Sequence, residues 1–507
     1  MFTRHALARV VAAAWFAAAA TAFTASAVHA AEPTTLKWAY NLPTRWDPVT
    51  SVTGYDIHLL SLTYSGLTRL NEQGEAKPAL AESWAYNDAG TEVVFKLRPG
   101  LKFSDDTPLD AEAVRAHLQR ARTQKNSSAK EVLESVADVV AVDPLTVRIV
   151  LNRPDYQLPL ILAGRPGLIT SATVAARDPA SLDKKPVGAG PFKLTEVVTE
   201  SHAYFVKDPN YWDAANIHID KFELYVALDK TSIIPAIRSG VYDFAEINAN
   251  QVDEAKRAGL VVEAKPSQEA RAVFVNINEK PFDDARVVEA VRYGTNRQEY
   301  IDKITFGYAK ATNQPFPPTD PTFSTDVNDL WPYDPDRARK LLADAGYPPG
   351  TLSVTIKGSA GTVLEILQKQ LKAIGINATI QALPAGQSIT EIIVRKQAQI
   401  AANIGTQGRE SPVLGLLSAY GVTGNINLSA PFASDAFLKA IDQVRKTPID
   451  SKDYLPALHL AVKEAVVSNP TNWLYSSPRI IAHSPRVTDV PSVPITFRWE
   501  GAKVKQP

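Results

Sequence analysis

The chain has 507 residues, with 54 basic and 54 acidic side chains, so its formal net charge at pH 7 is zero. This balance argues against a nucleic-acid partner, because nucleic-acid-binding proteins usually carry a strong basic excess. The sequence contains no cysteine, which excludes disulfides, thiolate catalysis, iron–sulfur ligation and lipid attachment through an N-terminal cysteine.

A targeting segment opens the chain. Arg4 and Arg9 precede an apolar, alanine-rich run at residues 10–22, and small residues typical of a cleavage site follow. The run is shorter than the roughly 20 residues that a membrane span needs. The pattern predicts a signal peptide over residues 1–31 that is removed on export, with a retained signal anchor as the alternative. The remaining chain is long enough for two or three domains.

The first half of the mature chain mixes strand and helix patterns. Residues 36–40 and 93–97 alternate as strands do, and the leucine spacing after Ile57 favours a helix. Asp110 can cap a helix whose apolar stripe starts at Val114. Residues 138–151 are expected to form two strands around an Asp-Pro turn.

Two extended runs separated by a polar turn follow at residues 186–213. Phe192, Leu194 and Val197 precede the turn at residues 199–201, and a second aromatic and β-branched run follows it. This pattern predicts a β-hairpin.

The second half contains the best-defined helix signal. Asp334 and Pro335 supply a cap and a first-turn proline, and Gly346 marks the end of this helix. Residues 352–382 then read as strand, helix and strand, which predicts a βαβ unit with a locally parallel sheet. Further helices are expected around residues 437–444 and 458–466.

Several tracts, in order along nearly the whole mature chain, resemble the large periplasmic solute-binding proteins of ABC transporters in the peptide/nickel class (family 5). Each tract is weak alone, and their common order carries the resemblance. The tracts include Leu80-Ala81-Glu82-Ser83-Trp84, Val187-Gly188-Ala189-Gly190-Pro191-Phe192, Asp208-Pro209-Asn210-Tyr211-Trp212 and Pro281-Phe282-Asp283-Asp284-Ala285-Arg286-Val287.

The resemblance implies an α/β fold of the two-lobed periplasmic-binding-protein type (class II, cluster C) with an extra β-rich domain inserted in lobe one. It implies lobe one at residues 32–71, 186–266 and 477–507, the insert at 72–185, and lobe two at 267–476. It also implies a periplasmic monomer that captures a small ligand in the interlobe cleft and delivers it to an ABC permease and its ATPase. No cofactor, bound metal or nucleic acid is expected.

The ligand implied by the resemblance is a short peptide or peptide-derived compound, with an opine, sugar conjugate or metal chelate as the alternative. In peptide-binding members, a tract resembling Trp-x-x-Asp-Tyr-x-Asp-Pro supplies the Asp that pairs with the ligand's amino terminus. Residues 405–412 match this tract, but Gly405 replaces the Trp and Gly408 replaces the Asp. This departure argues against an unmodified peptide.

Candidate ligand contacts come from two regions that face the cleft in this family. A guanidinium at Arg45 could clamp a carboxylate and Trp46 could stack on a ligand, although a solvated Arg and a packed Trp are the alternatives. A charge at Arg409 or Glu410 could replace the missing Asp, or these side chains could be solvent-exposed. The full set is Arg45, Trp46, Thr50, Tyr55, Gln407, Arg409, Glu410, Tyr420 and Asn425.

Catalytic and metal signatures are weak. The mature histidines lack ligand spacing such as His-x-x-x-His. A secreted serine hydrolase is the alternative from another functional class, but no Gly-x-Ser-x-Gly elbow is present, and the Ser-x-x-Lys matches lack the further boxes of penicillin-binding enzymes. The sequence therefore predicts a binding protein and not an enzyme.

Overall fold

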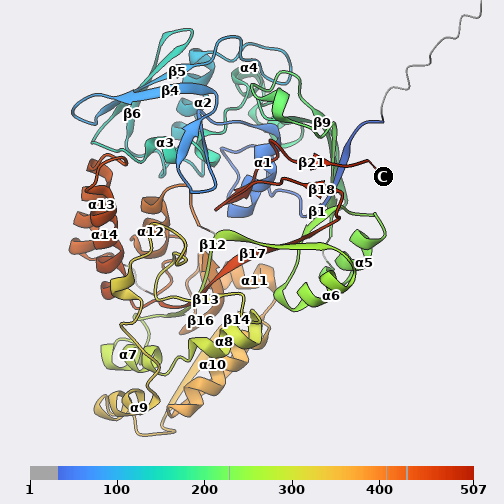
Figure 1. The fold of residues 1–507 in the computed structure, drawn as a ribbon. Helices are drawn as coiled ribbons and strands as arrows, with labels where there is room; N and C mark the ends of the chain where they lie inside the picture. Colours follow the sequence, from blue (N-terminus) through green and yellow to red (C-terminus); the bar gives the residue numbers. More distant parts are fainter. Residues whose placement is uncertain (1–31, 228, 407, 430–431, 507) are drawn as a thin grey trace, which may run out of the picture. The chain divides into compact units, whose positions relative to one another are not determined.

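An eleven-stranded mixed sheet dominates the compact unit Thr34–Pro507 (Figure 1). The computed structural model describes residues 32–227, 229–406, 408–429 and 432–506, and this strand number refers to them. The predicted signal peptide therefore lies outside the described residues. The strand order is β15 (Ile376–Leu383), β14 (Leu352–Ser359), β16 (Ile400–Thr406), β12 (Val261–Val275), β17 (Asn472–His483), β11 (Phe244–Glu246), β1 (Thr35–Tyr40), β10 (Lys221–Val226), β9 (His202–Lys207) and β8 (Phe192–Val198), with β13 (Lys310–Ala311) also pairing with β17.

Both supersecondary predictions in this sheet are confirmed. Strands β8 and β9 pair as an antiparallel hairpin, with Phe192 opposite Lys207 and Val198 opposite His202. Strands β14 and β15 pair in parallel from Leu352↔Ile376 to Ser359↔Leu383, with α10 (Thr362–Ala373) between them in the chain. The aromatic and β-branched runs of the hairpin suit a pleated, half-buried surface. The apolar face of α10 is buried in the protein core.

A separate four-stranded antiparallel sheet forms the β-rich insert, drawn in blue and cyan in Figure 1. Its order is β4 (Ala81–Tyr86), β5 (Glu92–Leu97), β7 (Thr146–Leu151) and β6 (Val136–Asp143). Helix α2 (Ala111–Thr123) belongs to the same core, and the Asp110 side chain caps it by accepting from the Ala113 N–H at 3.0 Å. The predicted cap, stripe and Asp-Pro turn are all present.

The two longest strands, β12 and β17, run antiparallel through the middle of the sheet. They pair from Val261↔His483 to Val273↔Asn472, with a register shift between the pairs Lys265↔Arg479 and Glu269↔Ser477. On one side of this pair lie β11 and β1, and on the other side lies β16. The predicted lobe boundaries at 266/267 and 476/477 therefore fall within β12 and β17, at and next to this shift.

The aromatic core beside β1 is built from residues far apart in the sequence. The Trp38 ring stacks on Tyr40 with centroids 4.6 Å apart. Phe497 lies edge-on to Trp38 at 5.8 Å, and the Trp499 ring is tilted against it at 5.4 Å. Such pairs add about 0.5–1.5 kcal/mol beyond their burial. The C-terminal segment is therefore part of the same core as the first strand.

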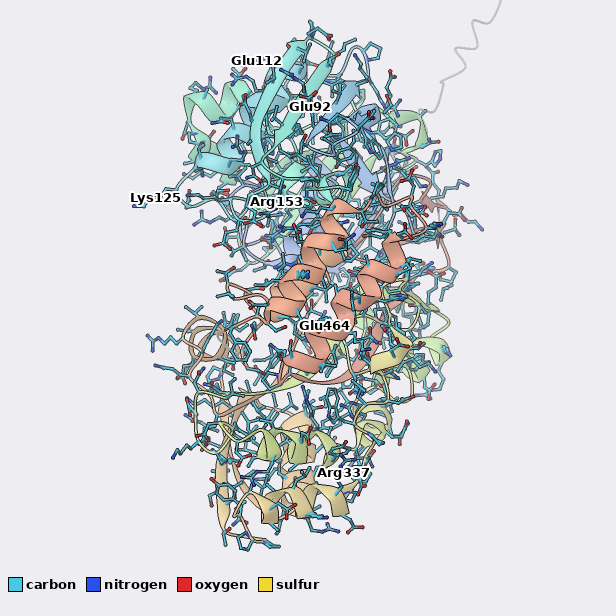
Figure 2. The ribbon with its side chains drawn as sticks, turned by 90° about the vertical axis from the view of Figure 1, so that its left-hand side faces the viewer. Glu92, Glu112, Lys125, Arg153, Arg337 and Glu464 are labelled. Atoms are coloured by element: carbon cyan, nitrogen blue, oxygen red, sulfur yellow. The ribbon has the colours of Figure 1, made fainter. Side chains whose placement is uncertain are left out.

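The other elements are short or cover the sheets. Figure 2 shows α14, marked by Glu464, running alongside a second helix, and α9, marked by Arg337, at the far end from the insert. The remaining helices are α1 (Ile57–Thr63), α3 (Leu158–Ile161), α4 (Ala172–Arg177), α5 (Ile233–Arg238), α6 (Val252–Arg257), α7 (Ala285–Tyr293), α8 (Arg297–Ile304), α9 (Pro335–Asp344), α11 (Ala385–Ser388), α12 (Pro412–Tyr420), α13 (Asp435–Lys446) and α14 (Tyr454–Ser468). The remaining short strands are β2 (Thr68–Leu70), β3 (Ala76–Pro78), β18 (Val487–Thr488), β19 (Ser492–Val493), β20 (Thr496–Phe497) and β21 (Lys503–Val504).

Candidate ligand-binding site

A cavity of about 680 Å³ lies over the β12–β17 pair. Its described lining comes from the loop before α1, the segment after β11, strands β12 and β17, the loop after α8 and the segment after β16. This volume lies in the usual range of small-molecule pockets, about 300–1,000 Å³. Its walls therefore come from elements on both sides of the β12–β17 pair.

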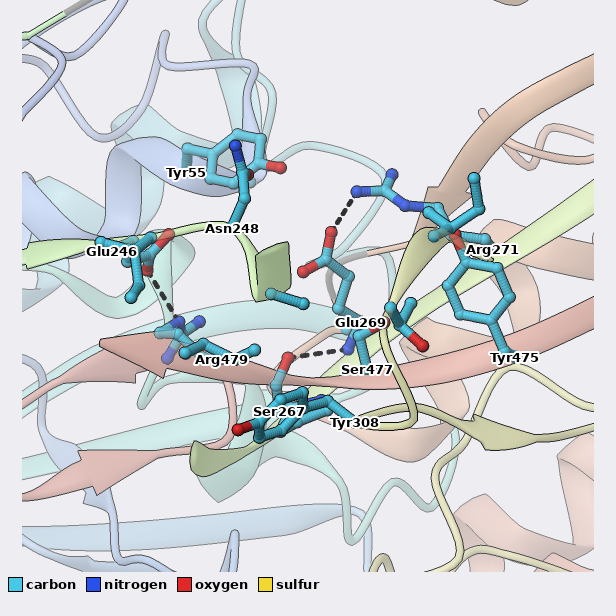
Figure 3. Close-up of a pocket in the computed structure, with 18 of the residues that line it drawn as sticks. Tyr55, Glu246, Asn248, Ser267, Glu269, Arg271, Tyr308, Tyr475, Ser477 and Arg479 are labelled. Atoms are coloured by element: carbon cyan, nitrogen blue, oxygen red, sulfur yellow. Dashed lines mark hydrogen bonds and ion pairs between the residues drawn. The ribbon is translucent and has the colours of Figure 1, made fainter. Parts of the chain in front are cut away.

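Two carboxylates of the cavity each form an ion pair with an arginine, one on the same strand and one on the adjacent strand. Glu269 and Arg271, both on β12, form a hydrogen-bonded ion pair. Glu246, at the end of β11, pairs with Arg479 on β17, with 2.9 Å between Oε1 and Nε. Figure 3 shows both pairs, with Tyr55 and Asn248 drawn above them. These charges are therefore largely neutralised within the protein.

The third carboxylate, on Glu410, is buried against the insert. Its Oε1 accepts from the backbone N–H of Arg165 at 3.3 Å. A Cβ on Gly164 would lie 1.9 Å from the Glu410 side chain, so only glycine leaves room for this contact. The Arg165 guanidinium in turn donates to the Ser51 carbonyl at 2.7 Å. Glu410 thus ties the segment after β16 to the insert.

Besides Arg165, whose guanidinium donates to the Ser51 carbonyl, two basic side chains of the cavity lack an ion-pair partner among the described residues. Arg409 and Lys230 form no ion pair with any other described residue, whereas Lys303 pairs with Glu299 at 2.8 Å. Of the three acidic side chains in the described lining, Glu246 and Glu269 form ion pairs with arginines and Glu410 accepts a backbone N–H. The charge left for a ligand is therefore positive.

Tyr55 contributes a neutral polar group to the lining of this cavity. Burial, with a further contribution from Glu269, raises the pKa of Tyr55 to about 12. The nearby Arg271 guanidinium partly offsets this rise of the pKa. The hydroxyl therefore stays protonated near neutral pH and can bind a ligand without adding negative charge.

Of the predicted contacts, Tyr55, Arg409 and Glu410 line this cavity. Arg45 lies away from it and pairs with Asp183 at 2.8 Å. Asn425 also lies away from it and accepts a hydrogen bond from Ser418 at 2.5 Å. Gln407 lies outside the described residues.

Three other predicted contacts are in the protein interior and do not line this cavity. Trp46 is 5% exposed and its ring meets Phe205 edge-on at 5.9 Å, and Thr50 is also buried. Tyr420, a predicted ligand contact, is the last residue of α12, and its hydroxyl accepts from the Trp473 indole at 2.7 Å. The apolar sequence of α12 buries this helix, so the ring faces the core.

Sequence reasoning missed the charged residues on the central strands. Glu269, Arg271 and Arg479 lie within long strands, and Glu246 ends a short one. Charged residues inside long strands are a usable signal, because a buried charge needs a partner. The sequence alone does not show that β11, β12 and β17 lie next to one another, and this arrangement brings the charged residues together.

The two glycines that depart from the family tract have no room for side chains. Gly408 has φ of +83°, and an added Cβ would lie 2.3 Å from Oε1 of Gln268. At Gly405 an added Cβ would lie 2.0 Å from the carbonyl oxygen of Ala270. With this backbone, neither a Trp at 405 nor an Asp at 408 can be accommodated.

Within the residues that the structure describes, no cluster of three or more His, Asp or Glu side chains could hold a metal ion. A membrane-crossing helix is likewise not found in that part of the chain.

Comparison with known proteins assigns the family. The model of the bacterial extracellular solute-binding proteins, family 5, middle region, matches residues 75–426. The chain belongs to this family. Its members are substrate-binding components of transporters, so the protein is the substrate-binding component of an ABC importer, with the two-lobed α/β fold.

Individual relatives differ in what their names say they bind. The glutathione-binding protein GsiB of Escherichia coli (strain K12) is 31% identical over 383 residues, which is 74% of this chain and 74% of GsiB. DppA of Helicobacter pylori, in complex with the peptide STSA, has a TM-score of 0.81 at 22% identity, covering 94% of this chain and 99% of DppA. AgaA of A. tumefaciens R10, in complex with agropinic acid, has a TM-score of 0.81 at 21% identity, covering 93% and 99%.

Proposed function

We propose that this protein captures a small, net-anionic, peptide-derived solute in the cavity over β12 and β17 and delivers it to an ABC permease with its ATPase. The observation that carries the proposal is the charge of the cavity. Its three described carboxylates are engaged by the protein, whereas Arg409 and Lys230 have no ion-pair partner among the described residues.

An anionic ligand follows from the cost of desolvation. A charged group removed from water is destabilised unless it gains a partner of opposite charge. Closure over a ligand carboxylate would give Arg409 such a partner, with a charge-assisted hydrogen bond worth about 1.5–3 kcal/mol. A ligand with a net positive charge would find Glu246 and Glu269 already paired with arginines and Glu410 already bonded to the Arg165 N–H.

The peptide-derived character is supported by neutral polar groups and by the relatives. Tyr55, Asn248 and Ser477 offer hydroxyl and amide groups that suit a peptide backbone or amide. GsiB is named for glutathione, a tripeptide with two carboxylates and one ammonium group. An anionic non-peptide solute, of the kind bound by AgaA, is the second candidate because it would satisfy the same two cations.

The proposal extends to export and to the moving parts. Residues 1–31 would be removed as a signal peptide, leaving the mature protein in the periplasm. The lobes would divide at 266/267 and 476/477, with residues 72–185 as the insert. Ligand binding would then couple to closure about the β12–β17 pair.

Isothermal titration of the mature protein with glutathione tests the proposal. Arg409→Gln is expected to weaken binding about 10–100-fold, because it removes one charge-assisted hydrogen bond. The control is Arg177→Gln, which changes an exposed arginine on α4 outside the cavity and should leave the affinity unchanged. Raising the salt concentration should also weaken binding of the parent protein more than binding of Arg409→Gln.

Stabilisation against heat gives a second readout with a panel of anionic and cationic solutes. Ligand at 100 times its Kd adds about 2.7 kcal/mol to the stability of the folded state. Stabilisation by basic peptides but not by glutathione, acidic peptides or opines would contradict the anionic-ligand proposal.

A further inference from the structure

A second hollow of about 750 Å³ borders the ligand cavity. One wall comes from residues 70–77, residues 84–86 of β4 and the segment at 156–160 in and before α3. The other wall comes from residues 320–322, 448–450 and the start of α14. This volume is itself in the range of small-molecule pockets, so the two hollows together exceed what one small polar solute needs.

The second hollow, called the groove below, has a mainly apolar wall. It includes Trp84, Tyr156, Leu160, Ile449, Leu455 and Leu458. Ile449 and Leu455 are 37% and 43% exposed, which is unusual for large apolar side chains that line a concave surface.

Most polar groups of the groove already have partners in the protein. Glu75 pairs with Lys77 at 2.8 Å, and Asp320 accepts from the Gln268 amide at 2.8 Å. The Tyr86 hydroxyl donates to the Asp155 carbonyl at 2.8 Å. What the groove offers a ligand is therefore mainly apolar surface, in contrast to the free cations of the first cavity.

The two hollows meet at Arg409 and Glu410, which line both. We infer that they hold one ligand: its carboxylate-bearing part occupies the first cavity beside Arg409, and an apolar extension of the same molecule occupies the groove. The inference rests on the proposed function, since it assigns the charged part to the same cavity. The ligand class is then an amphiphilic, peptide-derived anion carrying an acyl, alkyl or aromatic group.

The groove walls are held together by bonds near the junction. The Tyr156 N–H donates to the Arg445 carbonyl at 2.9 Å. The Gln157 amide donates to the Tyr454 hydroxyl at 3.2 Å and accepts from the Ser411 hydroxyl at 2.8 Å. Ser411 directly follows Glu410 in the chain. The hydrogen bonds between the two walls of the groove therefore lie next to the residues that the groove shares with the ligand cavity.

A matched pair of probes tests the inference by isothermal titration. Glutathione supplies the charged part alone, and S-hexylglutathione adds a six-carbon chain. S-hexylglutathione is expected to bind at least about tenfold more tightly, since each buried methylene contributes to affinity. The variants Ile449→Gln and Leu455→Gln should remove most of this advantage and leave glutathione affinity unchanged. Both side chains are partly exposed, so these substitutions should not unfold the protein.

The control variant is Leu460→Gln, on the same helix as Leu455 and 48% exposed, but not on the wall of the groove. It should keep the full advantage of the hexyl chain. Equal affinities for the two probes, or an advantage that survives in both groove variants, would overturn the inference while leaving the proposed function intact. Failure of both probes to bind would overturn a glutathione-like ligand and the inference with it.

Discussion

Gly408 provides a sharp test of the packing around the ligand cavity. An alanine there must adopt φ near +83°, and its Cβ would lie 2.3 Å from Oε1 and 2.4 Å from Cβ of Gln268. Gly307 has the same φ of +83° but no atom within 4 Å of the corresponding position. Gly307→Ala should therefore cost only the backbone term, about 1–2 kcal/mol.

Gly408→Ala should pay the same backbone term and also displace Gln268. That side chain donates to Asp320 at 2.8 Å and accepts from the Arg409 N–H at 3.2 Å. The bond to a carboxylate is worth about 1.5–3 kcal/mol and the other about 0.5–1.5 kcal/mol. Gly408→Ala should therefore be more destabilising than Gly307→Ala by about 2–4 kcal/mol.

The assay is urea unfolding of the mature protein, comparing the free energies of unfolding of the two variants. A second comparison uses Gln268→Gly as the parent, because removing the whole side chain relieves the clash. In that background Gly408→Ala should cost no more than Gly307→Ala does in the unchanged protein. Equal destabilisation by the two alanines in the unchanged protein would refute the view that Gln268 fills the space above Gly408.

Two further predictions concern stability. Asp47→Ala removes the buried partner of the Arg120 guanidinium, which lies 2.7 Å away, and should lower the free energy of unfolding in urea by about 3–5 kcal/mol. The control is Glu112→Ala, which breaks an exposed ion pair on the same helix as Arg120 and should cost about 1 kcal/mol or less. Equal losses in the two variants would contradict the estimate for Asp47→Ala. Hydrogen bonds, that from Lys303 first, lower the pKa of Glu299 from 4.5 to about 2. The carboxylate therefore contributes stability above pH 4.5 that is lost as the pH falls towards about 2, so the stability advantage over Glu299→Gln should shrink across that window and not between pH 6 and 8.

Local signals in the sequence predicted many elements well. Asp334 caps α9 by accepting from the Arg337 N–H at 2.9 Å, and Pro335 is its first residue. Helix ends depend on bonds within a few residues, so a cap and a first-turn proline are readable without the rest of the fold. The hairpin at residues 192–207 follows from the same kind of local pattern.

The site was predicted only in part. Arg409 and Glu410, expected because they lie where the chain departs from its family's tract, line the cavity. Trp46 and Tyr420 were expected near the ligand, but both rings are buried elsewhere. Residue type and motif position do not specify the direction of a side chain, which packing against distant elements decides.

By itself, the sequence determined the family, many of the helices and strands and the absence of cysteine chemistry. These properties depend on local patterning and composition. The tertiary structure alone decided which charges are available to a ligand. Arg479 neutralises Glu246, and the insert engages Glu410, only because strands and loops distant in the sequence are adjacent in the fold. A charge becomes free or paired through such contacts, and no single stretch of the chain contains both partners.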